Sequence, residues 1–131
     1  MTPGGAVVAD RLPRRRDLLG ETMDRIGPEA FEGDRLLRQG TWAIAFLADW
    51  CPFCRSFAPE FEALAVSQDF QIAVADLADE DSPLWERFDV AVVPTIIAFR
   101  DGRSIFRRDG HLGEGLSTAD LAALTQALGP T

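Results

Sequence analysis

The chain has 131 residues, of which 47% are hydrophobic and 26% are charged, as in a globular domain that can bury a core. Its 13 basic and 21 acidic residues give a net charge of −8, which argues against nucleic acid as a main partner. No segment is long and apolar enough to span a bilayer, and residues 1–16 lack the apolar core of a secretory signal. We therefore expect a cytoplasmic protein with no membrane partner.

The N-terminal segment differs from the rest of the chain. Residues 1–22 contain several glycines and prolines and the basic run Arg14-Arg15-Arg16. We expect a flexible leader at 1–22, since termini without apolar periodicity are usually solvated, and one folded domain at 23–131.

Apolar patterns predict the elements of this domain. Near-continuous apolar runs at 42–48 and 70–77 are typical of strands buried on both faces of a sheet. Apolar residues spaced by three and four predict helices, and Ser117 with Asp120 predicts a capped helix start. The expected elements are strands at 23–26, 42–48, 70–77, 96–99 and 103–107, helices at 29–38, 52–66 and from 118, and a short helix or turn at 83–88. This order predicts an α/β fold with helices on both faces of a mixed sheet.

Cys51 and Cys54 are the only cysteines, and they lie between a buried strand and a helix. Two intervening residues allow the sulfurs to form a disulfide within one helical turn. Free N–H groups at a helix N-terminus stabilise a thiolate, which is the nucleophilic form of cysteine. The pair predicts redox chemistry carried by a Cys51–Cys54 disulfide, with no other cofactor and no metal.

Four features together resemble the thioredoxin family over residues 23–128. They are Trp50-Cys51-Pro52-Phe53-Cys54 after a buried strand, Pro59 five residues later, Val93-Pro94-Thr95 before a strand, and the hairpin signal Phe99-Arg100-Asp101-Gly102. The resemblance implies the thioredoxin fold and a protein disulfide reductase acting on disulfide-containing proteins. It also implies a monomer recycled by a flavin-dependent reductase.

The same resemblance assigns roles to residues. Cys51 is expected to be the exposed nucleophile, and Cys54 the shielded thiol that resolves the mixed disulfide. The Val93–Pro94 bond is expected to be cis, with the Val93 backbone holding an extended substrate like an added strand. The residues expected to bind substrate are Trp50, Pro52, Phe53, Val93, Pro94, Thr95 and His111.

Two departures from the family pattern leave alternatives open. Pro52-Phe53 resembles glutaredoxins, which favours a glutathione-coupled reductase as the alternative. Ala45 stands where the family usually buries an aspartate. We hypothesise that Asp76 on the next strand is the general base for Cys54, against the alternative that it is a solvated charge.

His111 is the only histidine, and it lies in a loop at 110–117 that is longer than usual for the family. It is either a group that assists the Cys51 thiolate or an exposed loop residue without a role. A metal or iron–sulfur module would require thiolates borrowed from a second chain. A non-catalytic adaptor is hinted at only by Ala45.

Overall fold

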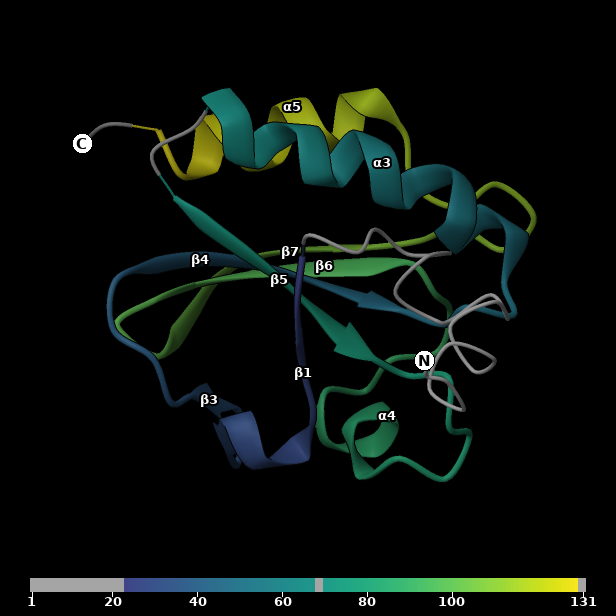
Figure 1. Ribbon diagram of the computed structural model, residues 1–131, viewed down its shortest axis with the longest axis horizontal. Helices are drawn as coiled ribbons and strands as arrows, with labels where there is room; N and C mark the ends of the chain where they lie inside the picture. Colours follow the sequence, from purple (N-terminus) through teal and green to yellow (C-terminus); the bar gives the residue numbers. More distant parts are fainter. Residues whose placement is uncertain (1–22, 68–69, 130–131) are drawn as a thin grey trace, which may run out of the picture.

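The computed structural model describes residues 23–67 and 70–129, so the expected leader at 1–22 lies outside the described residues. A five-stranded sheet forms its centre (Figure 1). The elements are β1 (Asp24–Ile26), η1 (Pro28–Ala30), β2 (Phe31–Glu32), β3 (Arg35–Leu36), β4 (Thr41–Leu47), α3 (Pro52–Ser67), β5 (Gln71–Asp76), α4 (Pro83–Arg87), β6 (Thr95–Arg100), β7 (Arg103–Asp109) and α5 (Thr118–Ala127).

The sheet is mixed, with the strand order β1-β5-β4-β6-β7. β4 is central, pairing in parallel with β5 and antiparallel with β6. Every residue of β4 after Thr41 is buried, as its apolar sequence predicts. The β6–β7 hairpin turns at Asp101 and Gly102, which both have positive φ, as a two-residue hairpin turn requires.

Helices cover both faces of the sheet, which confirms the predicted fold class. Helices α3 and α5 both lie on one face, and α4 lies on the other with the β2–β3 hairpin (Figure 1). On the α4 side, the ring of Phe31 packs at 4.9 Å from Phe88, which in turn lies 5.2 Å from Phe46. Phe61 of α3 and Leu124 of α5 are fully buried on the other side.

The helix predicted at 29–38 is wrong. The structure has the short 3-10 helix η1 there, followed by the antiparallel pair β2–β3. Phe31 pairs with Leu36 across the hairpin, so both side chains reach the core from one face, while Leu37 stays 57% exposed. Gly33 makes the turn with φ of 61°. The dipeptide Gly33-Asp34 is a hairpin signal that outweighs the apparent helical spacing.

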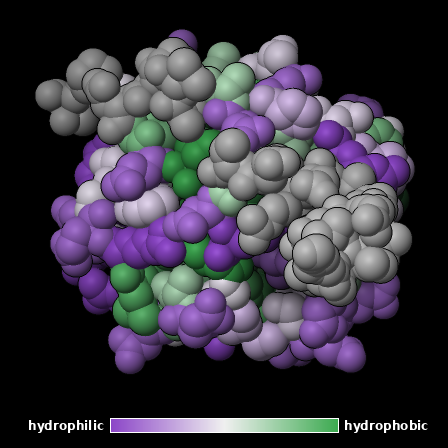
Figure 2. Space-filling view, viewed as in Figure 1, coloured by the Kyte–Doolittle hydropathy of each residue, from purple (hydrophilic) through white to green (hydrophobic). Residues whose placement is uncertain are grey.

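The remaining predicted elements agree with the structure to within a few residues, and α3 includes Pro59. The capped start of α5 is confirmed, since the Ser117 N–H donates to Oδ2 of Asp120 at 2.8 Å. In the part of the chain that the structure describes, no helix has the length and hydropathy needed to cross a membrane. The face shown in Figure 2 is largely hydrophilic, with apolar residues visible in the hollows between polar ones.

Candidate functional site

The two cysteines lie where the central strand meets helix α3. Cys51 directly precedes the first residue of α3, and Cys54 lies in its first turn. Both are free thiols, with Cys51 8% exposed and Cys54 fully buried. The sulfur of Cys54 accepts a hydrogen bond from the Ala48 N–H, at 3.4 Å between N and S. Of the two sulfurs, that of Cys51 is therefore the one open to a partner.

The protein environment holds Cys54 in its protonated form. Burial raises the pKa of the Cys54 thiol well above its ordinary value, and the neighbouring Cys51 raises it further. The Ala48 N–H and the Arg55 guanidinium oppose this by lowering the Cys54 pKa. Arg55 is kept near the pair by a 2.8 Å hydrogen bond from Nη1 to the Asp49 carbonyl. Cys54 must lose its proton before it can act as a nucleophile.

The cis peptide bond expected at Val93–Pro94 is present, and it faces the pair. The Cys51 sulfur lies 3.7 Å from the Val93 carbonyl oxygen. Thr95 is fully buried, and its hydroxyl donates to the Val92 carbonyl at 2.7 Å, so this side chain shapes the turn rather than lining the surface. Gly110 packs directly on the Pro94 carbonyl, where a Cβ atom would collide with the oxygen.

A groove of about 300 Å³ opens over Cys51. Six residues predicted for the site line it: Trp50, Cys51, Pro52, Phe53, Val93 and His111. Sequence reasoning missed five further lining residues: Trp85, Ala91, Val92, Leu112 and Gly113. Leu112 is 88% exposed, and an apolar residue inside a glycine-rich loop was the available signal for it. The groove is thus mainly apolar next to the reactive sulfur.

Two stacked indoles form one wall of this groove. The rings of Trp50 and Trp85 lie 6.4 Å apart and within 13° of parallel. The Nε1 of Trp50 donates to the Ala78 carbonyl at 2.9 Å, and the Nε1 of Trp85 donates to the Asp79 carbonyl at 3.1 Å. Because both N–H groups are anchored in one turn, the pair forms a fixed platform beside Cys51.

The loop bearing His111 forms another part of the rim. The loop is closed by hydrogen bonds between the backbones of His111 and Gly115, at 3.1 and 2.8 Å. Gly115, with φ of 73°, lies so close to Phe53 that a Cβ atom would be 2.9 Å from the Phe53 side chain. The His111 side chain is exposed at the groove, and its assistance to the Cys51 thiolate stays a prediction.

Asp76 lies at the end of β5, paired in register with Leu47. Its Oδ2 lies 3.2 Å from Nη1 of Arg25, and its Oδ1 accepts a hydrogen bond from the Ala78 N–H at 2.9 Å. Asp76 therefore braces the turn that anchors the Trp50 indole. Its action as a base for Cys54 stays a prediction.

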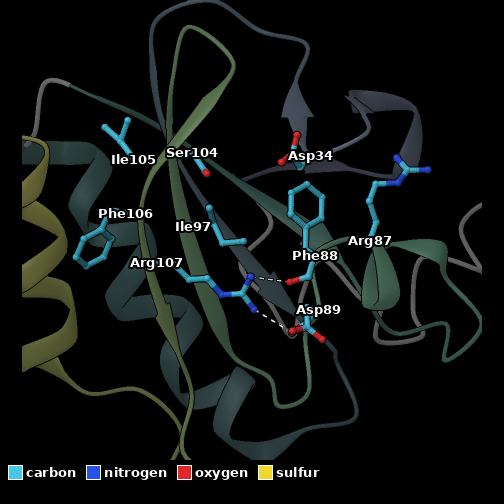
Figure 3. Close-up of a pocket in the computed structure, with 9 residues that line it drawn as sticks. All are labelled: Asp34, Arg87, Phe88, Asp89, Ile97, Ser104, Ile105, Phe106 and Arg107. Carbon is cyan, nitrogen blue, oxygen red and sulfur yellow. Dashed lines mark hydrogen bonds between the residues drawn. The ribbon is translucent and has the colours of Figure 1, made fainter.

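Arg107 of β7 holds the segment that leads into the cis-proline turn. Its guanidinium donates to the carbonyl oxygens of Phe88 and Asp89, at 2.6 and 3.0 Å, just after α4 (Figure 3). The same group pairs with both carboxylate oxygens of Asp109, at 2.6 and 2.9 Å. Asp89 has φ of 52°, so this fork fixes the residue where the chain turns away from α4.

Comparison with known proteins agrees with this geometry. The family model described as Thioredoxin matches residues 25–123. The chain belongs to the thioredoxin family. A thioredoxin of Rhodospirillum rubrum is 32% identical over 91 residues, which are 69% of this chain and 88% of that protein. A solved structure of Chlamydomonas reinhardtii thioredoxin f2 has 19% identity and a TM-score of 0.68, covering 83% of this chain and 99% of that one. The latter shows the thioredoxin fold alone.

A longer relative is also similar. The thioredoxin-related transmembrane protein 1 of Bos taurus is 39% identical over 79 residues, or 59% of this chain. This chain spans only 28% of that protein's length. Thioredoxin-family membership and the cysteine pair support thiol–disulfide oxidoreductase chemistry in general. Within residues 23–67 and 70–129, no group of three or more histidine, cysteine, aspartate or glutamate side chains is arranged so that it could hold a metal ion.

Proposed function

We propose that the chain reduces protein disulfides by dithiol–disulfide exchange through Cys51 and Cys54. The observation that carries the proposal is the asymmetry of the pair. Cys51 borders an apolar groove and lies 3.7 Å from the Val93 carbonyl, while Cys54 is fully buried behind it. Two-step exchange needs one thiol that contacts the partner as nucleophile and a second, shielded thiol that resolves the mixed disulfide.

In the first step, the Cys51 thiolate attacks one sulfur of the partner disulfide. A Cys51–partner S–S bond forms, the partner S–S bond breaks, and the leaving sulfur takes a proton. Cys51 directly precedes α3, so its sulfur lies near the positive end of the helix dipole. The backbone of Val93 and the apolar groove walls would hold the partner segment in place.

In the second step, Cys54 loses its proton and attacks the Cys51 sulfur. The Cys51–Cys54 bond forms, the Cys51–partner S–S bond breaks, and the leaving partner sulfur takes a proton, so two electrons pass from the pair to the partner. The mixed disulfide removes the Cys51 contribution that raises the Cys54 pKa. Asp76 is our proposed base for this step, acting from the end of β5.

The proposed partners are disulfide-containing proteins, with a flavin-dependent reductase restoring the dithiol in the cytoplasm. The glutathione-coupled alternative rests on Pro52-Phe53, where Phe53 is 40% exposed beside Cys51. Reduction of the oxidised protein by NADPH with a flavin reductase, compared with reduction by glutathione alone, separates the two sources of electrons.

The test of the proposed function uses a protein disulfide substrate with dithiothreitol as the source of electrons. The wild type is expected to reduce it with multiple turnovers, Cys51→Ser is expected to have no activity, and Cys54→Ser is expected to accumulate a mixed disulfide at Cys51. Substrate reduction by Cys51→Ser that is faster than reduction by dithiothreitol alone would refute the proposal. A redox potential of the pair far above the glutathione potential would instead indicate an oxidant.

A further inference from the structure

A second hollow lies next to the apolar groove over Cys51. Trp85 lines both the groove of about 300 Å³ and this hollow of about 410 Å³. Among the residues that the structure describes, the charged ones that line the second hollow are all acidic: Glu80, Asp81, Glu86 and Asp89. A partner lying in the groove would therefore meet an apolar surface at Cys51 and a negative one beyond Trp85.

One stretch of backbone borders both spaces. Ala91, Val92 and Val93 line the groove, and Asp89 and Val90 line the acidic hollow. Val90 and Asp89 lie three and four residues before Val93, so an extended peptide that runs along this backbone with its cysteine at Cys51 would reach the hollow about two to four residues away. A charged side chain of the peptide would therefore lie at the hollow only if it is this many residues from the peptide's cysteine.

The nearby arginines are directed elsewhere. Arg87 donates to the Pro28 carbonyl at 3.4 Å, and Arg107 is held by backbone carbonyls and Asp109. Arg107 does lie close enough to Asp89 to interact with its charge. Neither arginine lines the hollow, so the carboxylates of Glu80, Asp81 and Glu86 face it without a cation among the lining residues that the structure describes.

The indole platform adds a second preference for a cation. Both indole N–H groups are occupied by the carbonyls of Ala78 and Asp79, which leaves ring surface as the part of Trp50 and Trp85 that a partner meets. Trp50 is 48% exposed. Guanidinium and ammonium groups bind indole faces and carboxylates at the same time, whereas an acidic side chain is repelled by the hollow.

Building on the proposed function, we infer that the preferred partner is a protein disulfide with an apolar residue beside its cysteine and an arginine or lysine about two to four residues away. The apolar residue packs against Phe53, Val92 and Leu112. The basic residue lies over Trp85 and pairs with the carboxylates of the acidic hollow.

The experiment measures kcat/KM for reduction of disulfide-linked peptide dimers. Each peptide carries leucine beside its cysteine and arginine, glutamine or glutamate about three residues away, on either side. We expect the arginine peptide to exceed the glutamine peptide by about fivefold on one side, and the glutamate peptide to fall below it. In about 0.5 M salt the ratio is expected to approach one, because these charges are exposed and screened.

Matched variants locate the effect. Glu80→Gln with Glu86→Gln is expected to remove most of the arginine-to-glutamine ratio. Glu32→Gln with Glu60→Gln removes the same charge from exposed positions outside the groove and is expected to keep the ratio. Reduction of all three peptides at equal rates by the wild type would overturn this inference and leave the proposed function standing. Reduction of none of them, nor of a protein disulfide, would refute both.

Discussion

Truncating Arg107 tests how much its guanidinium, which binds the carbonyls of Phe88 and Asp89, stabilises the segment before the cis-proline turn. In Arg107→Met, the apolar stem stays and the guanidinium is lost, so packing changes little. Two hydrogen bonds to the carbonyls of Phe88 and Asp89 disappear, at about 1 kcal/mol each. The ion pair with Asp109 is partly exposed and adds about 0–1 kcal/mol. The expected loss in free energy of unfolding is about 2 kcal/mol.

Urea unfolding measures this loss, and Arg108→Met is the matched control. Arg108 lies next on the same strand and makes one 3.4 Å ion pair with Asp120, so its removal is expected to cost about 0.5 kcal/mol. Arg107→Lys should fall between the two, since an ammonium cannot form the planar fork. The Arg107→Met variant should also raise KM for a disulfide substrate, because Phe88 and Asp89, which lead into the groove-lining residues 91–93, are less firmly held. Equal losses in Arg107→Met and Arg108→Met would refute the reasoning.

Three further changes have defined outcomes. Gly110→Ala should destabilise the protein by about 1–3 kcal/mol and slow disulfide reduction, because the new Cβ meets the Pro94 carbonyl. Gly27→Ala is the control, since its Cβ meets only the movable Glu29 carboxylate. Equal losses of stability in the two variants would contradict this reasoning. Because the Cys54 pKa is raised in the folded protein, the unfolded chain loses the Cys54 proton at a lower pH than the folded protein does. The free energy of unfolding of the reduced form, measured in urea, should therefore fall above about pH 9, by up to about 1.4 kcal/mol per pH unit. The oxidised form has no such thiol and should not show this fall, and a parallel fall in both forms would exclude Cys54 as its cause. Phe61→Ala removes a fully buried ring and should cost about 3–5 kcal/mol in urea unfolding, while a loss under 1 kcal/mol would contradict its place in the core.

The sequence predicted the features that depend on local pattern and rare residue types. Strand β4 and helix α3 follow from apolar runs and spacing, and the cysteine pair and Val93-Pro94 are distinctive in kind and order. The hairpin at Phe31–Leu36 was missed because the turn signal Gly33-Asp34 was given too little weight. Phe31 and Leu36 are five residues apart, which does not match the spacing of three or four along one helical face.

What the sequence did not predict are contacts between distant segments. Trp85 stacks on Trp50 because the 78–79 turn anchors both indoles, and nothing in the short segment around Trp85 marks it as part of the site. Arg107 likewise carries no motif, since its partners are backbone carbonyls at Phe88 and Asp89. Backbone acceptors leave no trace in sequence patterns, so such positioning residues become visible only when the fold is known.

The stacked indoles give the protein an optical signal of its own. Trp50 and Trp85 are two of the three tryptophans in the chain, and the third, Trp42, lies at the start of β4, away from the cysteines. Near-parallel indoles 6.4 Å apart couple their electronic transitions, which produces a paired band in circular dichroism. A disulfide beside Trp50 would also quench its fluorescence. Oxidation of the pair and occupation of the groove can therefore be followed spectroscopically in the unlabelled protein.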